Sequence, residues 1–251
     1  MEVVAYLAVT TLWWISSLTV LSPFVLLLLL SKTFRNGWFS FFFGKVMGPL
    51  CSHKFMAKRK KLFELLEEHL PNRDKSIPLD ILEIGIGPGA NLQFYPENSN
   101  LTALDMNPSF FQIFHNNRKK YPQVKLVRTV LNWAEDMNEV EDSAYDVVIS
   151  THVLCSVKNI ESVMKEVKRV LKPGGKFLFL EHVAYPENEG GHLAQRFAAP
   201  LWAVYCDGCY PNRNTADAIK NAGFSDVQCD VSYSPSLLLF IRPHIIGVAT
   251  K

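Results

Sequence analysis

The stretch Ile81-Leu82-Glu83-Ile84-Gly85-Ile86-Gly87-Pro88-Gly89-Ala90-Asn91 decides the fold. Its apolar beginning is typical of a buried strand, and the three glycines that follow indicate a sharp turn. Glycine is needed where the backbone turns tightly and a ligand approaches with no Cβ in the way. In open parallel sheets, ligands bind at the carboxyl ends of strands, which is where this turn falls. The stretch therefore predicts a ligand-binding loop formed by Gly85, Gly87 and Gly89.

Short apolar runs alternate with amphipathic stretches along the chain after residue 70. This alternation predicts an α/β fold with a parallel sheet and helices on both faces. We expect helices over residues 55–70, 108–120 and 160–171, and a long aromatic insertion over residues 184–211. The expected strands cover residues 79–84, 101–104, 124–127, 146–150, 177–180, 227–233 and 244–250.

The N-terminus is a long apolar segment, because no residue from Val3 to Ser31 carries a formal charge. A membrane-spanning helix needs about 20 such residues. A secretory signal would begin with basic residues, whereas Glu2 is the only leading charge here. We therefore expect residues 1–31 to be an uncleaved membrane anchor rather than a signal peptide or a buried core helix. Pro23 interrupts the segment, so a single span and a hairpin in one leaflet both remain open.

The formal net charge of +2 hides a strong asymmetry. Residues 1–61 hold eight Lys/Arg and one acid, and residues 62–251 hold 18 Lys/Arg and 23 acids. A basic front on an acidic body favours a membrane-facing leader over a nucleic-acid binder. The positive-inside rule then places the rest of the chain in the cytoplasm. We expect residues 32–78 to form a basic and aromatic interfacial linker with a helix, and residues 79–251 to form the globular domain.

The cysteines do not follow the spacing of a disulfide framework, which predicts reduced thiols in a cytosol-facing domain. Cys206-Asp207-Gly208-Cys209 contains two possible zinc ligands, and no second Cys-x-x-Cys or His pair follows at a suitable spacing. We therefore expect no metal, while a redox pair remains open. The five cysteines are Cys51, Cys155, Cys206, Cys209 and Cys229.

Acidic residues follow the second and third predicted strands. Asp105 lies 20 residues after Gly85, where a carboxylate can bind both hydroxyls of a ribose. A nicotinamide dinucleotide site would use the same acid, and capping of the next helix is a compatible role. Ala134-Glu135-Asp136 lies where the edge of a base is expected, although an exposed acidic loop has the same composition. Residues 169–176 indicate a helix end, a Pro-Gly-Gly turn and a new strand.

Together these features resemble the class I S-adenosylmethionine-dependent methyltransferases. Five further motifs are similar to those of the membrane-anchored methyltransferase-like 7 family, which are thiol S-methyltransferases of the endoplasmic reticulum and lipid droplets. The resemblance extends from the anchor to Lys251. The motifs are Gly-Ala-Asn-Leu-Gln-Phe-Tyr-Pro (89–96), Val-Leu-Cys-Ser-Val (153–157), Glu-His-Val-Ala (181–184), Asp-Gly-Cys (207–209) and Arg-Pro-His-Ile (242–245).

The resemblance implies a seven-stranded, Rossmann-like methyltransferase sheet behind a membrane anchor. It implies methyl transfer from S-adenosylmethionine to small lipophilic thiols, with membrane lipid as a further partner and neither nucleic acid nor metal. The expected location is the endoplasmic reticulum membrane and lipid droplets, with the catalytic domain facing the cytosol. Two rivals remain: an O- or C-methyltransferase of a membrane lipid or quinone, and a non-catalytic lipid-droplet protein.

The methyl donor is expected to contact one group of residues. The glycines allow close backbone approach, the glutamate before them holds the donor's amino group or the loop around it, and Asp105 takes the ribose. One of the two acids after the third strand takes the adenine edge. These donor residues are Glu83, Gly85, Gly87, Gly89, Asp105, Glu135 and Asp136.

The acceptor is expected at the ends of the fourth and fifth strands. His152 and His182 lie there, and either ring can draw a proton from a thiol, although a lone histidine can equally be a packing residue. Aromatic side chains of the insertion form either core or an apolar wall for the acceptor. They are Phe197, Trp202, Tyr205 and Tyr210.

Overall fold

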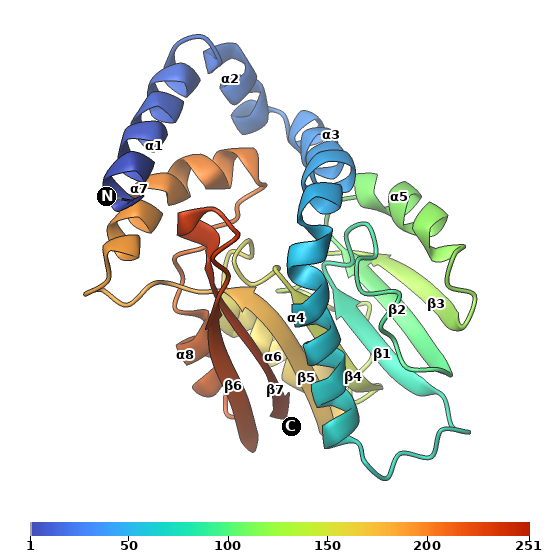
Figure 1. Ribbon diagram of the computed structural model, residues 1–251. Coiled ribbons are helices and arrows are strands. Elements are labelled where there is room, and N and C mark those ends of the chain that lie inside the picture. The colour runs from blue at the N-terminus through green and yellow to red at the C-terminus, as the bar shows by residue number, and fades with distance from the viewer. Residues whose placement is uncertain (1) are drawn as a thin grey trace.

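The central element is a seven-stranded sheet (Figure 1), seen in a computed structural model that describes residues 2–251. Every expected strand is present, and most are longer by a few residues. The apolar runs of the inner strands are buried on both faces of the sheet, whereas the edge strands β3 and β6 are partly exposed. The strands are β1 (Leu79–Ile84), β2 (Ser99–Asp105), β3 (Val124–Leu131), β4 (Tyr145–Thr151), β5 (Leu171–His182), β6 (Asp226–Tyr233) and β7 (Pro243–Thr250).

The strand order is β3-β2-β1-β4-β5-β7-β6. Strands β1 to β5 pair in parallel, but β7 is antiparallel to both β5 and β6. The expectation of a parallel sheet is therefore wrong for β7, because residues 234–242 join β6 to β7 without the helical crossover that parallel pairing requires. A dinucleotide-binding sheet has the parallel order 3-2-1-4-5-6, so this topology disfavours a nicotinamide site.

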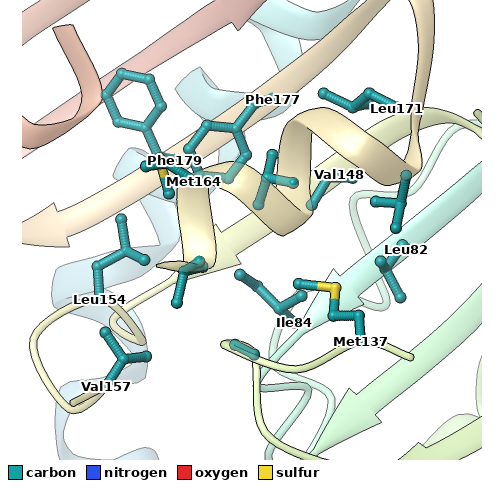
Figure 2. Packing of buried hydrophobic residues seen from close by; sticks show 14 of the residues in the cluster. Leu82, Ile84, Met137, Val148, Leu154, Val157, Met164, Leu171, Phe177 and Phe179 are labelled. Carbon is teal, nitrogen blue, oxygen red and sulfur yellow. The ribbon is translucent and has the colours of Figure 1, made fainter. Parts of the chain in front are cut away.

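Helices cover both faces of the sheet, as expected (Figure 1). On one face, Leu62 and Leu66 of the long helix pack with Ile81 in one buried cluster. On the other face, Met164 packs with Phe177 in a second cluster (Figure 2). The first face carries α4 (Gly48–His69) and α5 (Ser109–Arg118), and the second carries α6 (Ile160–Val170) and α8 (Thr215–Lys220).

The predicted helices are confirmed, and the insertion contains one that the pattern did not indicate. Helix α7 (Gly190–Tyr205) runs through Pro200, a residue that normally argues against a helix interior. The long helix α4 begins earlier than expected, since it continues from α3 (Lys32–Phe41) through a π-helical turn, η1 (Phe42–Met47). The short helix η2 (Leu239–Ile241) precedes β7.

The apolar N-terminal segment folds as two helices, α1 (Glu2–Leu18) and α2 (Ser22–Leu30). They are bent by 78° at a break that falls just before Pro23, which lies in the first turn of α2, where proline is tolerated. Within residues 2–251, no individual helix combines the length and the apolar composition needed to cross a bilayer. The bent pair α1–α2 reaches both when taken together.

The N-terminal helices pack against α7 (Figure 1). The indole of Trp14 donates to the carbonyl of Phe197 over 3.1 Å, and Ser17 Oγ lies 3.0 Å from the Tyr205 hydroxyl. Helix α3 adds a hydrogen bond of 2.9 Å from Trp38 Nε1 to the Tyr205 carbonyl. The apolar leader and the aromatic insertion are thus one connected layer above the carboxyl ends of the strands.

Candidate active site

A cavity of about 810 Å³ lies at the carboxyl ends of β1, β2, β4 and β5. The glycine loop, Asp105 and Glu135 line one half, which we call the donor half. His152 and His182 line the other half together with apolar side chains of α2, α3, α4 and α7. We call this the acceptor half. The strands place these residues together because parallel strands end at the same edge of a sheet.

The three glycines of the loop are required for different reasons. Gly85 has a φ of +64°, and a Cβ there would lie 2.4 Å from Val153 Cγ2. At Gly89 a Cβ would lie 2.6 Å from Leu92 Cδ1. At Gly87 the nearest atom to a Cβ would be the Gly85 carbonyl oxygen, 4.0 Å away. Gly87 is therefore the loop residue that faces open space, while the other two allow the loop to pack closely against Val153 and Leu92.

Glu83 is buried at the end of β1 and lines the cavity. Asn91 Nδ2 donates to its carboxylate over 3.0 Å, and the Tyr95 hydroxyl donates to the other oxygen. Burial raises the pKa of Glu83 to about 8, although the nearby Arg59 guanidinium acts in the opposite direction. These contacts show that Glu83 holds the loop that follows the glycines.

Asp105 is buried at the end of β2, with each carboxylate oxygen accepting one backbone hydrogen bond of 2.8 Å. The donors are the amides of Gly87 and Asn107, so Asp105 joins the glycine loop to β2. Burial raises its pKa to about 6. Asp105 does not cap α5; instead Asn107 Oδ1 accepts from the Ser109 amide over 3.0 Å.

The two acids after β3 lie in different surroundings. Glu135 lines the cavity, and its Oε1 accepts from the Lys158 amide over 2.5 Å. Its Oε2 is buried and has no hydrogen-bond partner. Asp136 is exposed and lies outside the cavity lining. Of the two acids, Glu135 is therefore the one whose position suits an adenine edge.

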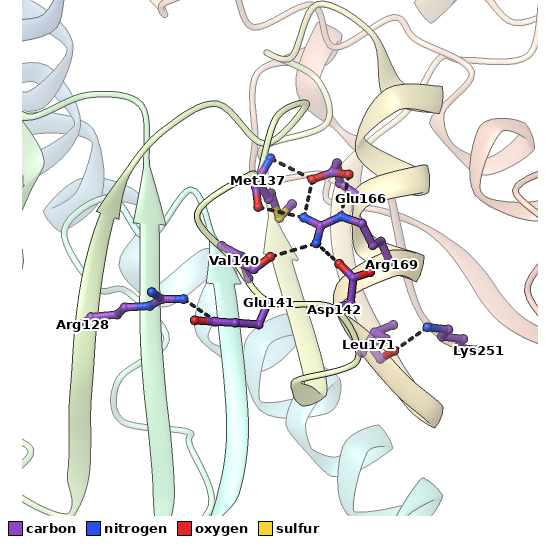
Figure 3. Close-up of polar contacts among 9 residues, drawn as sticks. All are labelled: Arg128, Met137, Val140, Glu141, Asp142, Glu166, Arg169, Leu171 and Lys251. Carbon is purple, nitrogen blue, oxygen red and sulfur yellow. Dashed lines mark hydrogen bonds and ion pairs between the residues drawn. The ribbon is translucent and has the colours of Figure 1, made fainter.

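The loop that carries Glu135 is held by Arg169 at the end of α6 (Figure 3). The Arg169 guanidinium donates to the carbonyls of Met137 and Val140 over 2.7 and 2.8 Å. It also pairs with Glu166, whose carboxylate accepts from the Met137 amide over 2.8 Å. The Arg-Val-Leu-Lys-Pro-Gly-Gly stretch thus acts at a distance, by fixing one wall of the donor half.

The acceptor half contains a cluster of histidines. The ring of His182 lies 4.6 Å from that of His152 and 4.8 Å from that of His244, measured between centroids. Burial lowers the pKa of His152 and of His182 well below the usual value, and lowers that of His244 to about 4. These shifts favour the neutral form of all three rings.

The aromatic side chains of the insertion divide between the two expected roles. Trp202 and Tyr210 line the cavity. Tyr205 instead packs against Trp13, with 5.4 Å between ring centroids, and Phe197 lies outside the cavity lining. The remaining apolar wall comes from α2, α3 and α4, and includes Leu28, Leu29, Phe39 and Phe55.

Several site residues were not singled out from the sequence. Arg59 lies on the long helix, where nothing in the local pattern distinguishes it from neighbouring surface bases. Asn91, Cys155 and His244 belong to the motifs that carry the family resemblance, which was the available signal. The contacts of these residues in the site join segments that are far apart in the sequence, so a local pattern does not reveal them.

The donor half fits S-adenosylmethionine. The space above Gly87 admits a ligand next to the backbone, and the buried, unpartnered Glu135 Oε2 can accept from an amine. Buried carboxylates favour a cationic molecule over an anionic pyrophosphate. The fold and this site define an S-adenosylmethionine-dependent methyltransferase.

Comparisons with known proteins agree. A family model described as "Methyltransferase domain" matches residues 82–179. A SAM-dependent methyltransferase of Thermotoga maritima superposes with a TM-score of 0.57 at 17% identity, covering 85% of this chain and 98% of that one. Phosphoethanolamine N-methyltransferase 2 of Haemonchus contortus, in complex with S-adenosyl-L-methionine, superposes with a TM-score of 0.54 at 15% identity, covering 76% and 52%.

Two curated relatives define the family. Thiol S-methyltransferase TMT1B of Rattus norvegicus is 36% identical over 210 residues, covering 84% of this chain and 86% of the relative. Thiol S-methyltransferase TMT1A of Homo sapiens is 36% identical over 214 residues, covering 85% and 86%. The chain belongs to this TMT1 family and uses S-adenosylmethionine as its methyl donor.

Proposed function

We propose that this protein is a membrane-anchored thiol S-methyltransferase that acts on small lipophilic thiols. The observation that carries the proposal is the cavity, which joins an acidic donor half to an acceptor half with apolar walls. Such walls favour an acceptor that loses little hydration on binding. The thiol specificity of the relatives' names supports sulfur as the atom methylated.

When bound, the donor supplies a methyl group on a sulfonium sulfur. Glu83 and Asp105 hold the loop that positions this group, and the walls from Phe55 and Trp202 exclude water around the acceptor. Holding two reactants in line and away from water can supply several kcal/mol. His152 and His182 face the cavity and are the proposed proton acceptors for the thiol.

We further propose that α1 and α2 anchor the protein in the endoplasmic reticulum membrane and lipid droplets, with the catalytic domain in the cytosol and membrane lipid as a partner. Large apolar side chains on these helices and on the turn between them are exposed, and Val20 in the turn and Leu30 on α2 reach 82% exposure. Basic residues follow the apolar segment without an intervening acid until Glu64, which favours a cytosolic domain. Two measurements test this location: resistance of the full-length protein to carbonate extraction, and its fractionation with endoplasmic reticulum membranes and with lipid droplets. A full-length protein that is freely soluble would contradict the proposal.

The acceptor class is tested with purified full-length protein, labelled donor and matched acceptors. We expect an apolar alkanethiol to exceed its alcohol analogue, a phenol and a quinone by at least about tenfold in kcat/KM, because a thiol ionises more readily and is intrinsically more nucleophilic. Glutathione should be poor, since its charges require desolvation. A preference for the phenol or quinone favours an O- or C-methyltransferase and overturns the proposal. Efficient methylation of glutathione overturns the lipophilic assignment.

A further inference from the structure

Four motifs that are distant in sequence meet in the acceptor half. They contribute Cys155 from the loop after β4, His182 from the end of β5, Cys209 from the loop after α7, and His244 from β7. Cys209 Sγ lies 3.3 Å from Cys155 Sγ and 3.8 Å from His182 Nδ1. All four side chains are buried.

The two sulfur atoms and the imidazole have the spacing of metal ligands. The ligand atoms of Cys155, His182 and Cys209 all lie within 4.8 Å of one another. In a tetrahedral zinc site with Zn–S near 2.3 Å and Zn–N near 2.0–2.1 Å, ligand atoms are roughly 3.5–3.8 Å apart. The separations of 3.3 and 3.8 Å differ from these values by a few tenths of an ångström, and the third separation, between Cys155 Sγ and the His182 ring nitrogen, is at most 4.8 Å. Two sulfurs and one imidazole nitrogen are ligands that zinc prefers.

The surrounding histidines can orient the His182 ring. His244 Nδ1 lies 2.9 Å from the Arg242 carbonyl, which can only accept, so this nitrogen carries the hydrogen and Nε2 carries the lone pair. The Nε2 atoms of His244 and His152 are buried and have no partner. Each histidine of this group has a ring nitrogen within 4.8 Å of the others. If Nδ1 of His182 binds a metal, the neighbouring imidazoles of His152 and His244 pack around its ring and restrict its orientation, as the groups around a metal ligand usually do.

We propose that Cys155, His182 and Cys209 bind one zinc ion whose fourth position faces the cavity and takes the sulfur of the acceptor thiol. The proposal rests on the thiol methyltransferase function above, and it makes His182 a metal ligand, which leaves His152 as the proton acceptor for the thiol. His182 and Cys209 line the cavity, so the fourth position is accessible from the acceptor half. Three protein ligands with one open position are the pattern of catalytic rather than structural zinc. The partner of Cys209 is Cys155, not its sequence neighbour Cys206, so the Cys-x-x-Cys spacing alone could not indicate this site.

The proposed step balances in atoms and charge. Cys155 and Cys209 lose two protons when the zinc binds, and the acceptor thiol loses one proton when it occupies the fourth position. The acceptor sulfur then forms a bond to the donor methyl, while the methyl–sulfonium bond breaks and its electron pair stays on the donor sulfur. The neutral thioether product is a weaker ligand than a thiolate and leaves. Each turnover releases one proton.

The ligands are tested by cobalt binding to the full-length protein, purified under reducing conditions and stripped with a chelator. We expect one equivalent of Co²⁺ to bind, with sulfur-to-cobalt charge-transfer absorption, and Zn²⁺ to displace it. Cys155→Ser and Cys209→Ser should each weaken Co²⁺ binding at least about tenfold and reduce that absorption. Cys229→Ser is the matched control, because this thiol lies on β6 outside the cluster, and it should change neither. Unchanged donor affinity shows that a serine variant is folded.

The fourth position is tested on the Co²⁺-loaded protein. An apolar thiol should shift the charge-transfer absorption, whereas its alcohol analogue should not. Absence of stoichiometric metal binding, a spectrum without sulfur ligation, or a stable Cys155–Cys209 disulfide in protein from cells overturns the site. A thiol that is methylated equally well by stripped and zinc-loaded enzyme overturns its role while leaving the thiol methyltransferase function intact. Metal binding without turnover of any thiol would instead contradict the proposed function.

Discussion

At the scale of single residues, Asp105 connects the glycine loop to β2 through its two 2.8 Å hydrogen bonds and faces the donor half. Asp105→Asn keeps the shape but replaces one acceptor oxygen with a donor. We expect donor affinity to fall by about 1.5–3 kcal/mol, the value of a hydrogen bond to a charged group. Titration calorimetry measures this change. Asp136→Asn is the matched control and should leave affinity unchanged, because Asp136 is exposed and outside the cavity; equal losses in the two variants would refute the assignment.

The raised pKa values of Glu83 and Asp105, about 8 and 6, predict that donor binding is linked to protons. At pH 7 these pKa values leave Glu83 mostly protonated and Asp105 mostly ionised in the free protein. A bound cationic donor favours the ionised form of both carboxyl groups. Binding should therefore release about half to one proton, and affinity should rise as the pH rises from 6 to 8. Calorimetry in buffers of different ionisation enthalpy measures the release. Glu83→Gln should reduce it, and a binding enthalpy independent of buffer would contradict the prediction.

The local sequence pattern was enough to predict that the glycines, Glu83 and Asp105 lie at the carboxyl ends of strands, because each belongs to a strand or to the turn that ends it. It was not enough for Arg59 or for the Cys155–Cys209 pair. Arg59 reaches the cavity from α4, and the two cysteines are 54 positions apart. Such contacts depend on how separate elements pack, which a local pattern does not contain.

At the scale of elements, strand positions followed from apolar runs, but the direction of β7 did not, because a run has the same pattern in either direction. The antiparallel position of β7 makes Gly247 critical. A Cβ there would lie 2.1 Å from the Gln228 carbonyl oxygen of β6 and 2.6 Å from the Phe179 ring of β5. The β6 backbone on one side of Gly247 and the buried Phe179 ring on the other can move little to make room for a Cβ.

We therefore expect Gly247→Ala to lower the free energy of unfolding by more than about 3 kcal/mol through overpacking. Denaturant unfolding of the purified protein measures the loss. The control is Gly37→Ala in α3, where a Cβ meets nothing within 4 Å and the residue is helical. This variant should be more stable by about 0.5–1 kcal/mol, as alanine is in a helix. Similar stabilities for the two variants would show that β7 is not held as described.

At the scale of the whole molecule, the division into an apolar leader (residues 1–31), a basic stretch (residues 32–61) and an acidic remainder was predictable from charge and hydropathy. The contact between them was not, because no local signal indicates that Trp14 and Ser17 meet α7. Nor did the insertion's composition predict a helix, since Pro200 argues against one. Because the N-terminal helices pack against α7, α2 contributes Leu28 and Leu29 to the acceptor half. The leader is thus part of the cavity wall as well as the proposed anchor.

Deletion of residues 1–31 should consequently separate three properties. The shortened protein should no longer resist carbonate extraction, and any remaining attachment through its basic residues should weaken in high salt. Donor affinity should stay within about threefold, because the hydrogen bonds of the glycine loop and of Asp105 are made with residues that remain. The KM for an apolar thiol should rise about tenfold or more, since Leu28 and Leu29 leave the wall and full burial of one leucine, as at Leu28, contributes about 1.5–3 kcal/mol. Val20→Ser with Leu30→Ser is the control: both side chains are exposed and outside the cavity lining, so this variant should partition less into membranes with an unchanged KM. A deletion that loses donor binding, or that keeps the full-length KM, would show that the leader does not form the acceptor wall.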